Sequence, residues 1–331
     1  MKVLMIDEVH PLIAEELAAN GFACDFFPDY QREDYLRIIG QYTGVIVRSK
    51  IRMDREILEK AINLKFIGRV GSGLENIDVD YAEQAGIVCL NSPEGNRDAV
   101  GEHTLGMLLS LLNHLNRADR EIRKGLWIRE GNRGMEIKGK TIGIIGYGNM
   151  GSAFAQRLKG FEANVISYDK YKQNYSDGNT RETTLEEIFE TATIVSLHIP
   201  LTEETTYLVD TAFLEKFRKH IWLINTSRGK VVKTSDLIEA LKSGRIQGAA
   251  LDVLEYEDSS FEALSKDLPA DFKYLMEADN VILTPHIAGW TFESNIRLAT
   301  VLVEKILTYW KESNTDDTKR QINADIIREN P

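Results

Sequence analysis

A glycine-rich segment in the middle of the chain carries the clearest chemical signal. Gly146, Gly148 and Gly151 follow an apolar run with the spacing G-x-G-x-x-G, and Asp169 ends the next apolar run. The first glycine permits a tight turn, the second lets a pyrophosphate approach the backbone, and the third lets a helix pack closely against the strand. This combination of strand, turn, helix and acid predicts a dinucleotide-binding site.

The same segment indicates which dinucleotide is bound. Asn149 and Met150 lie at the start of the helix that follows the turn, where free N–H groups and the positive end of the helix dipole favour phosphate. Asp169 follows the glycines at the distance that the fingerprint requires, and its carboxylate can accept both ribose hydroxyls. Because that carboxylate would repel a 2′-phosphate, we expect NAD to be preferred to NADP.

Three segments in the second half of the chain place charged side chains directly after apolar runs, where open parallel sheets bind their ligands. Arg228 has a planar guanidinium group that suits a carboxylate and a neighbouring carbonyl oxygen. His286 is a candidate general acid/base, and a carboxylate such as Glu255 or Glu257 could orient it. Taken alone, such an arginine is more often a surface cation and such a histidine more often structural or solvated, but their shared position after strands of one sheet favours a catalytic site.

Apolar runs that alternate with helical patterns predict parallel sheets covered by helices on both faces. In the first half we expect strands over residues 3–6, 23–27, 44–48, 65–70 and 88–91 and helices over 11–19, 35–42, 54–62 and 98–124. In the second half we expect strands over residues 141–145, 165–168, 194–199, 221–225, 248–253 and 281–284, and a last helix from 291 to about 310. Thr184 and Glu187 have the spacing of a capping box.

The position of the glycine motif predicts two domains, because a complete α/β domain precedes it. The chain after residue 284 is too short for a third domain, so the last helix is expected to return to the first. We therefore predict a discontinuous flavodoxin-like substrate domain, residues 1–98 plus 291–331, and a Rossmann NAD-binding domain, residues 99–290. Both are doubly wound parallel sheets, and a cleft is expected at the hinge helices.

The composition limits the classes of partner. The net charge of −11 argues against a nucleic-acid surface and against binding to anionic membranes. Cys24 and Cys89 lie far apart and in no metal-binding spacing, so we expect buried free thiols and no metal site. The first residues do not resemble a signal peptide, and the longest apolar run, residues 105–112, is too short to span a bilayer. We therefore expect a cytoplasmic protein with a small-molecule substrate.

Four motifs together resemble the D-isomer-specific 2-hydroxyacid dehydrogenase family over nearly the whole chain. They are Gly146-x-Gly148-x-x-Gly151, Thr226-Ser227-Arg228-Gly229, Ala250-Leu251-Asp252-Val253-x-x-x-Glu257 and Thr284-Pro285-His286-Ile287. The resemblance implies that Arg228, Glu257 and His286 are the catalytic residues and that Glu255 is a bystander. The family usually has a proline after its catalytic glutamate, whereas Asp258 follows here.

The resemblance also assigns binding residues. The further cofactor contacts that it implies are His198, Pro200, Thr205, Thr226, Ser227, Asp252 and Gly289. The segment 68–78 resembles the glycine loop that binds the substrate carboxylate through backbone N–H groups, here those of Ser72 and Gly73. Arg228 is expected to bind the carboxylate and polarise the C2 oxygen of the substrate. His286 is expected to move the hydroxyl proton while hydride passes between C2 and NAD, and Glu257 to orient the imidazole.

Residues 44–49 and 91–96 are similar to the 3-phosphoglycerate dehydrogenase branch of this family, in which Arg48 would face a substrate phosphate. The branch implies oxidation of D-3-phosphoglycerate to 3-phosphohydroxypyruvate, a step of serine biosynthesis. A hydroxypyruvate or glyoxylate reductase of the same family is an alternative, and a protein-binding corepressor that responds to NAD is a more distant one. Members of the branch often carry a serine-binding regulatory domain, and we expect that feedback mechanism to be absent here.

Two further expectations come from the resemblance. Family members form homodimers through their NAD-binding domains, and the apolar helix around residues 105–112 is the expected contact. Trp290 replaces a small residue that commonly follows the catalytic histidine. This tryptophan could line the pocket, shield it or pack against another part of the protein, and we favour packing.

Overall fold

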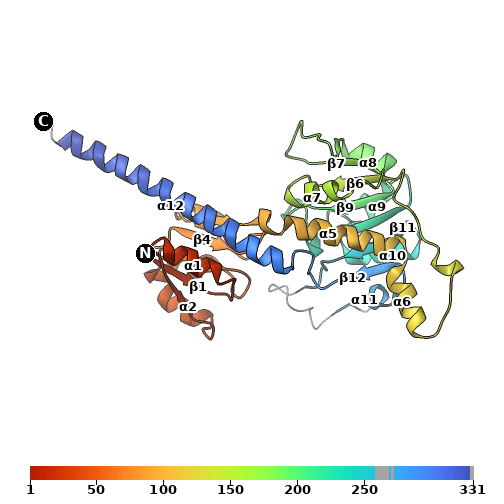
Figure 1. Cartoon of the computed structure of the whole chain (residues 1–331), viewed down its shortest axis with the longest axis horizontal. Coiled ribbons are helices and arrows are strands. Elements are labelled where there is room, and N and C mark those ends of the chain that lie inside the picture. Colours follow the sequence, from red (N-terminus) through yellow and green to blue (C-terminus); the bar gives the residue numbers. More distant parts are fainter. Residues whose placement is uncertain (258–267, 270–271, 329–331) are drawn as a thin grey trace. The chain divides into compact units, whose positions relative to one another are not determined.

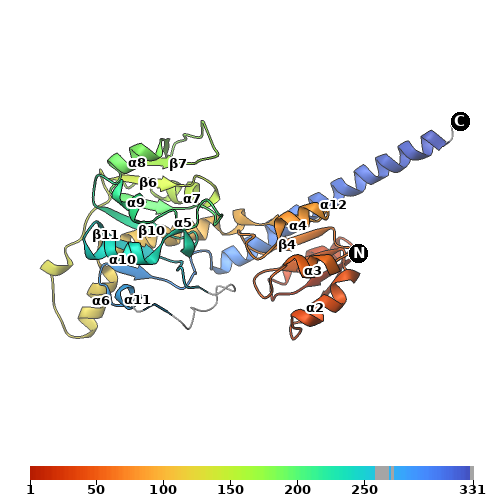
Figure 2. The ribbon, with the colours of Figure 1, turned by 180° about the vertical axis from the view of Figure 1, so that it is seen from behind.

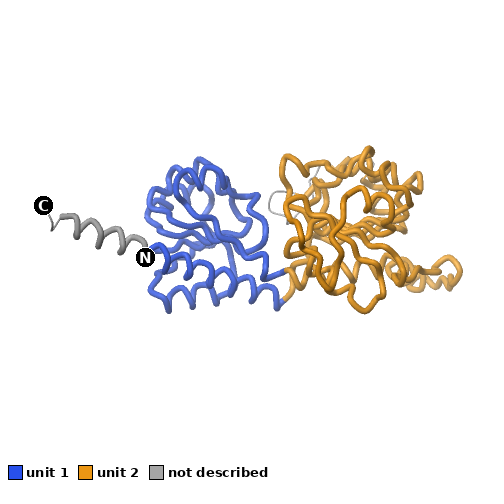
Figure 3. Tube along the Cα trace, turned by 90° about the horizontal axis from the view of Figure 1, so that it is seen from above, with its two compact units in different colours: residues 1–96, 292–331 blue, residues 97–291 orange. Residues whose placement is uncertain are grey.

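The computed structural model describes residues 1–257, 268–269 and 272–328, with side chains described as far as residue 313. The chain divides into two compact units: unit 1 comprises residues 1–96 and 292–331, and unit 2 comprises residues 97–291 (Figure 3). These boundaries lie one or two residues from the predicted ones. The substrate-binding and cofactor-binding roles that the sequence gives to the two units stay predictions.

Unit 1 is built around a parallel sheet. Its strands are β1 (Lys2–Met5), β2 (Ala23–Phe26), β3 (Gly44–Val47), β4 (Phe66–Arg69) and β5 (Val88–Asn91). Its helices are α1 (Leu12–Ala19), α2 (Arg32–Ile38), α3 (Arg55–Lys60), α4 (Val79–Gln84), the start of α5 (Pro93–Leu112) and α12 (Phe292–Arg328), with a 3₁₀ turn at Ile39–Gln41. The strand order β2-β1-β3-β4-β5, with all pairs parallel, is the flavodoxin-like order.

The core of unit 1 lies on both faces of this sheet, because successive strand residues point to opposite sides. Val3 and Ile46 pack on one face with α1 and with residues of α12 such as Leu302, while Leu4 and Val45 face α2 and α3. The last helix of the chain therefore completes the core of the first unit (Figure 1).

Unit 2 is a seven-stranded parallel sheet. Its strands are β6 (Thr141–Ile145), β7 (Asn164–Tyr168), β8 (Arg181–Glu182), β9 (Ile194–Leu197), β10 (Ile221–Asn225), β11 (Ile246–Leu251) and β12 (Val281–Leu283). The order β12-β11-β10-β9-β6-β7-β8 is the Rossmann order extended by one strand, and the strand sequence reverses between β6 and β9. The sequence analysis missed β8, since two polar residues give no apolar run.

Helices cover both faces of the sheet in unit 2 (Figures 1 and 2). The helices are the rest of α5, α6 (Leu115–Arg123), α7 (Asn149–Arg157), α8 (Leu185–Thr191), α9 (Thr211–Glu215), α10 (Thr234–Lys242) and α11 (Phe272–Glu277), with 3₁₀ turns at Glu130–Asn132 and Gly229–Val231. Helices α5 and α7 pack against one face with Ile142 and Ile144, and α8 to α11 cover the other face with Val195 and Leu223.

Three helix predictions need correction. The long helix expected over 98–124 is two helices, because His114 adopts a left-handed conformation with φ of 53° between α5 and α6. Helix α12 continues to Arg328 instead of ending near residue 310, and no glycine or proline interrupts it. Only half of the capping box forms: Thr184 accepts the N–H of Glu187, but the Glu187 carboxylate pairs with Arg181 and Thr183.

The predicted dimer contact over residues 105–112 stays a prediction. Met107, Leu108, Leu111 and Leu112 are buried in the core of unit 2, against the sheet. Leu105 and Leu109 of the same helix are only half-buried, so one face of the segment is still partly open.

Three further predictions concern membrane-spanning segments, metal sites and the burial of the cysteines. No helix in the described part of the chain is both long and apolar enough to cross a membrane. Among the described residues, no three His, Cys, Asp or Glu side chains gather as a metal site would require. Cys24 and Cys89 are free thiols that are half-buried rather than buried. Burial raises the pKa of Cys89 to about 11, so this thiol stays protonated at neutral pH.

Candidate active site

The glycine turn after β6 has the close packing that its spacing predicts. Gly146 adopts φ of +93°, and a Cβ atom there would overlap the carbonyl oxygen of His198. A Cβ atom at Gly151 would overlap the carbonyl oxygen of Gly146, so α7 lies too close to the turn for any side chain. Both positions therefore require glycine for reasons of backbone geometry.

The start of α7 is open toward the end of the sheet. Gly148 is the N-cap residue, and no described side chain caps the helix. Apart from its own chain neighbours, no described atom lies within 4 Å of the place where its Cβ would be. The N–H groups of the first helical turn, including those of Asn149 and Met150, have no partner within the helix. This arrangement leaves both space and hydrogen-bond donors for a phosphate group.

Asp169 lies directly after β7, beside this turn. Its Oδ2 atom accepts the N–H of Tyr147 at 2.8 Å and its Oδ1 atom accepts the N–H of Tyr171 at 3.0 Å. These two bonds hold the carboxylate in place and still leave lone pairs on both oxygens. Asp169 is thus positioned to accept further donors at the edge of the glycine turn.

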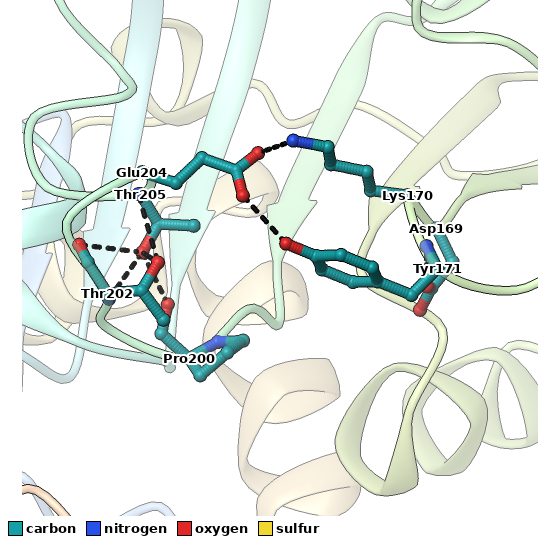
Figure 4. Close-up of polar contacts among 7 residues, drawn as sticks. All are labelled: Asp169, Lys170, Tyr171, Pro200, Thr202, Glu204 and Thr205. Atoms are coloured by element: carbon teal, nitrogen blue, oxygen red, sulfur yellow. Dashed lines mark hydrogen bonds and ion pairs between the residues drawn. The ribbon is translucent and has the colours of Figure 1, made fainter. Parts of the chain in front are cut away.

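The segment after β9 lies on the other side of the glycine turn. His198 is buried there, its Nε2 atom lies 2.8 Å from the Ser196 hydroxyl, and its Nδ1 atom has no partner in the described part of the chain. Burial lowers the pKa of His198 to about 3, so the imidazole is neutral at physiological pH. The Thr205 hydroxyl accepts the N–H of Thr202 and donates to the carbonyl of Pro200 at 2.7 Å (Figure 4). Thr205 and Pro200 therefore shape a turn, whichever ligand the segment binds.

A buried asparagine that the sequence analysis did not single out organises the turn after β10. The Asn225 side-chain oxygen accepts the N–H and the hydroxyl of Ser227, and its amide donates to the carbonyl of Arg228 at 2.9 Å. The Thr226 hydroxyl lies 3.1 Å from that of Thr104 on α5. The half-buried Arg228 follows this rigid turn, and its Nη1 atom donates to the carbonyl of Ser227 at 2.7 Å. The signal that could have identified Asn225 in the sequence is its polar side chain at the last position of an apolar strand.

His286 and Glu257 form a direct pair. The Nδ1 atom of His286 lies 2.8 Å from Oε2 of Glu257, and both side chains are largely buried, with 24% and 13% exposed. The other carboxylate oxygen of Glu257 accepts the N–H of Leu254, which fixes the glutamate. With Nδ1 bound to a carboxylate, Nε2 is the nitrogen to which we assign proton transfer with a substrate. Asp258, which departs from the family pattern, lies outside the described residues.

The backbone of His286 is held in an uncommon conformation. Its φ is 55°, in the left-handed region that side chains other than glycine seldom occupy. The N–H of His286 donates to the carbonyl of Asp252 at 2.7 Å. Such a conformation costs free energy and persists only where the surroundings enforce it.

Asp252 supplies that enforcement. Its carboxylate is 1% exposed and accepts the Thr284 hydroxyl at 2.6 Å, the N–H of Ile287 at 2.9 Å and the N–H of Ala288 at 2.8 Å. The Nε2 atom of His103 lies 3.6 Å from the carboxylate and 3.2 Å from the Thr284 hydroxyl. Asp252 was expected to contact the cofactor, and in this structure its carboxylate binds the turn that carries His286. Gly289 follows directly on this turn.

Trp290 comes at the end of the same turn, and 61% of its surface is exposed. Its N–H donates to the carbonyl of Ile287 at 2.9 Å. The packing role that we expect for Trp290 stays a prediction.

Unit 1 contains the residues that were predicted to bind substrate. The Ser72 hydroxyl donates to Asn96 at 2.7 Å and the Ser72 carbonyl accepts from Asn91, so the loop after β4 is well defined. The backbone N–H groups of Ser72 and Gly73 donate to no other described residue. Two adjacent unused donors are what an anion-binding nest requires.

Arg48 directly follows β3. Its N–H and those of Ser49 and Lys50 donate to the carboxylate of the buried Asp7 at 2.7 to 3.0 Å, and its carbonyl accepts from Asn76. The sequence analysis overlooked Asp7, which organises this loop from the end of β1. Arg48, Ser72 and Gly73 belong to unit 1, and the other predicted site residues belong to unit 2.

Comparison with known proteins decides the family. Residues 105–288 match the model of the D-isomer specific 2-hydroxyacid dehydrogenase NAD-binding domain. The chain belongs to this family of oxidoreductases. It is 33% identical over 313 residues to a D-3-phosphoglycerate dehydrogenase of Archaeoglobus fulgidus. The aligned region covers 94% of this chain and 58% of that relative. The chain thus spans little more than half the length of this relative.

Two other proteins that the chain resembles have names that give different activities. The chain is 35% identical over 276 residues to a hydroxypyruvate reductase of Thermotoga maritima, covering 83% of this chain and 87% of that protein. The crystal structure of an acyclic imino acid reductase in complex with NADPH and D-Arg matches with a TM-score of 0.83 at 28% identity, covering 94% of this chain and 98% of that one. These names differ in the activity that they give, and the structure of the imino acid reductase holds NADPH.

Proposed function

We propose that this protein is an NAD-dependent dehydrogenase that transfers a hydride between NAD and C2 of a D-2-hydroxy acid. The observation that carries the proposal is the hydrogen-bonded pair of His286 and Glu257, which follows strands of the sheet that also carries the glycine turn. A histidine oriented by a carboxylate is the general acid/base that oxidation of an alcohol requires.

The residues around the glycine turn fit a dinucleotide. The uncapped N-terminus of α7 and the empty space at Gly148 suit the pyrophosphate, and the fixed carboxylate of Asp169 suits ribose hydroxyls. When bound, the nicotinamide ring supplies the acceptor or donor of the hydride. We assign the remaining contacts to the segment after β9 and to the turn at Thr226 and Ser227.

The protein's own side chains handle the proton and the charge. In the oxidation direction, neutral His286 removes the proton of the C2 hydroxyl, and in the reduction direction the protonated imidazole returns it. Glu257 orients the ring through Nδ1 and stabilises its charged form. We assign Arg228 to the substrate carboxylate and to polarising the C2 oxygen, and the unused N–H groups of Ser72 and Gly73 to the carboxylate.

We propose D-3-phosphoglycerate as the substrate, oxidised to 3-phosphohydroxypyruvate in serine biosynthesis, with Arg48 binding the phosphate. The relative of this name matches almost the whole chain, which supports the proposal. A reductase of hydroxypyruvate or glyoxylate is the alternative, supported by the 35% identity to the hydroxypyruvate reductase of Thermotoga maritima.

A substrate comparison separates these two proposals. NADH formation from D-3-phosphoglycerate is measured beside NADH oxidation by hydroxypyruvate and by glyoxylate, with the wild type, Arg48→Ala and Arg52→Ala. Arg52 is an exposed arginine near Arg48 that makes no hydrogen bond to another described residue, so its variant controls for the lost charge. Turnover of phosphoglycerate that only Arg48→Ala abolishes supports the phosphate site. Activity with the unphosphorylated acids alone refutes it.

We also propose that the protein forms a homodimer through unit 2. Helix α6 has no buried residue, and α6 with the segment that follows it projects from the body of unit 2 (Figure 1). Large apolar side chains are exposed along this arm: Leu115, Ile122, Leu126, Trp127 and Ile128. Because exposed apolar side chains mark interaction surfaces, we propose this arm as a contact in addition to the predicted one at residues 105–112. A cytoplasmic location stays a prediction.

A further inference from the structure

We propose that Glu204 is a specificity-determining residue that favours NAD over NADP by holding the ammonium group of Lys170 away from a 2′-phosphate. This inference rests on the proposed dinucleotide site and concerns one side of it, where Asp169 faces the ribose. Glu204 is not part of the cofactor motif and lies more than thirty residues further along the chain than Asp169.

The sheet order brings the two residues to the same place. Asp169, Lys170 and Tyr171 follow β7, and Glu204 lies in the segment after β9. Strand β6 lies between β7 and β9 in the sheet, so these two segments flank the glycine turn that follows β6. Figure 4 shows Lys170 and Glu204 reaching toward each other between the two segments.

Glu204 accepts two donors from the opposite segment. Its Oε1 atom pairs with the ammonium group of Lys170, and its Oε2 atom accepts the Tyr171 hydroxyl at 2.7 Å (Figure 4). Hydrogen bonds from Lys170 and then Tyr171 lower the pKa of Glu204, and the same carboxylate raises the pKa of Lys170. Both side chains are therefore charged at neutral pH, and the positive charge of Lys170 is neutralised locally.

The segment that carries Glu204 is itself held in place. The Thr205 hydroxyl bonds within the turn to Pro200 and Thr202, and the Thr206 hydroxyl donates to the carbonyl of Thr202 at 2.6 Å. On the other side, the Tyr171 N–H is anchored on Asp169. The pairing thus joins two defined segments rather than two freely moving side chains.

The consequence for a dinucleotide follows from charge. A phosphate on the ribose 2′ oxygen needs a cation near the acid that ends β7, which is the role of a nearby arginine in NADP-binding sites. Lys170 is adjacent to Asp169 in the chain and would offer that cation, but Glu204 occupies it. Because the charge of Lys170 is balanced by Glu204, no cation offsets the repulsion between the Asp169 carboxylate and the phosphate. The ion pair is about half exposed, so it contributes little to folding, and its effect is on the local charge.

The test measures the binding of NADH and of NADPH to the full chain. Binding is detected by the fluorescence of the reduced dinucleotide, at low and at high ionic strength. Glu204→Gln should tighten NADPH binding about tenfold at low ionic strength and less in high salt, while NADH binding changes by no more than about twofold. The double variant Glu204→Gln with Lys170→Gln should return the NADPH affinity close to that of the wild type, because the freed ammonium group is gone.

Glu203→Gln is the matched control, since Glu203 is exposed, lies next to Glu204 and has no hydrogen bond or ion pair with another described residue. It should leave both affinities unchanged. An unchanged ratio in Glu204→Gln, an equal gain in Glu203→Gln, or a gain that persists without Lys170 would each overturn the inference. A wild type that binds NADPH as tightly as NADH would also overturn it and leave the proposed reaction standing. Failure of the wild type to bind either dinucleotide would instead refute the proposed function itself.

Discussion

Replacing Asp252 by asparagine should damage the site through the turn that carries His286. The substitution keeps the shape of the side chain but replaces one carboxylate oxygen, which accepts hydrogen bonds, by an NH2 group, which donates them. If the remaining oxygen keeps Thr284 and Ile287, the amide faces the N–H of Ala288, which is also a donor. Asp252 is 1% exposed, so water cannot readily replace the lost acceptor.

The size of the effect follows from these contacts. Hydrogen bonds to charged groups contribute about 1.5–3 kcal/mol each, and a buried donor left without a partner costs about 1–3 kcal/mol. We therefore expect Asp252→Asn to lower the free energy of unfolding by about 2–4 kcal/mol. Since the left-handed backbone of His286 depends on the same turn, turnover should fall at least tenfold.

The assay combines thermal unfolding, NADH binding and the turnover of the best 2-keto acid. Asp279→Asn is the control, because Asp279 is an exposed residue of the same unit whose salt bridge to Arg120 contributes at most about 1 kcal/mol. If Asp252→Asn behaved like Asp279→Asn in both stability and turnover, the positioning role of Asp252 would be refuted.

Three other predictions test separate parts of the account. Gly151→Ala should destabilise unit 2 and abolish NADH binding, because its Cβ would overlap the carbonyl of Gly146; unchanged binding in a titration would contradict this. The pKa of His198 falls to about 3 on folding, so the unfolded chain binds the extra proton and stability is lost as pH falls from about 6.5 toward 3. His198→Asn should remove up to about 1.4 kcal/mol per pH unit from that slope in urea unfolding, and an unaltered slope would exclude a neutral buried imidazole. Trp127→Glu should convert a dimer to a monomer in light scattering, whereas a dimer that survives would exclude the α6 arm as the contact.

The sequence predicted the fold well where burial is continuous. Strands such as Ile221–Asn225 are buried along their whole length, so the apolar run and the strand coincide. The glycine turn was also predictable, because Gly146 and Gly151 each lie so close to a backbone carbonyl oxygen that only glycine fits. His114, by contrast, ends a helix within an otherwise helical pattern, and no proline or glycine marks that position.

One contact of the candidate site was predictable from the sequence, and several others were not. The pairing of His286 with Glu257 was expected from motifs, since both follow strands of one sheet. The roles of Asn225 and Asp252 were not, because each depends on hydrogen bonds within turns whose conformation the sequence does not specify. The contact of Glu204 with Lys170 depends on strand order, which is decided by the packing of the whole sheet.

The most direct test of the central claim is the turnover of His286→Gln beside its affinity for NADH. The account predicts that turnover with the best substrate falls by about 10²–10⁴, because the general acid/base is gone, while the dissociation constant of NADH changes little. A variant that retains wild-type turnover would contradict the assignment of His286 as the proton-transferring residue. A loss of NADH binding equal to the loss of turnover would show instead that His286 belongs to the cofactor site.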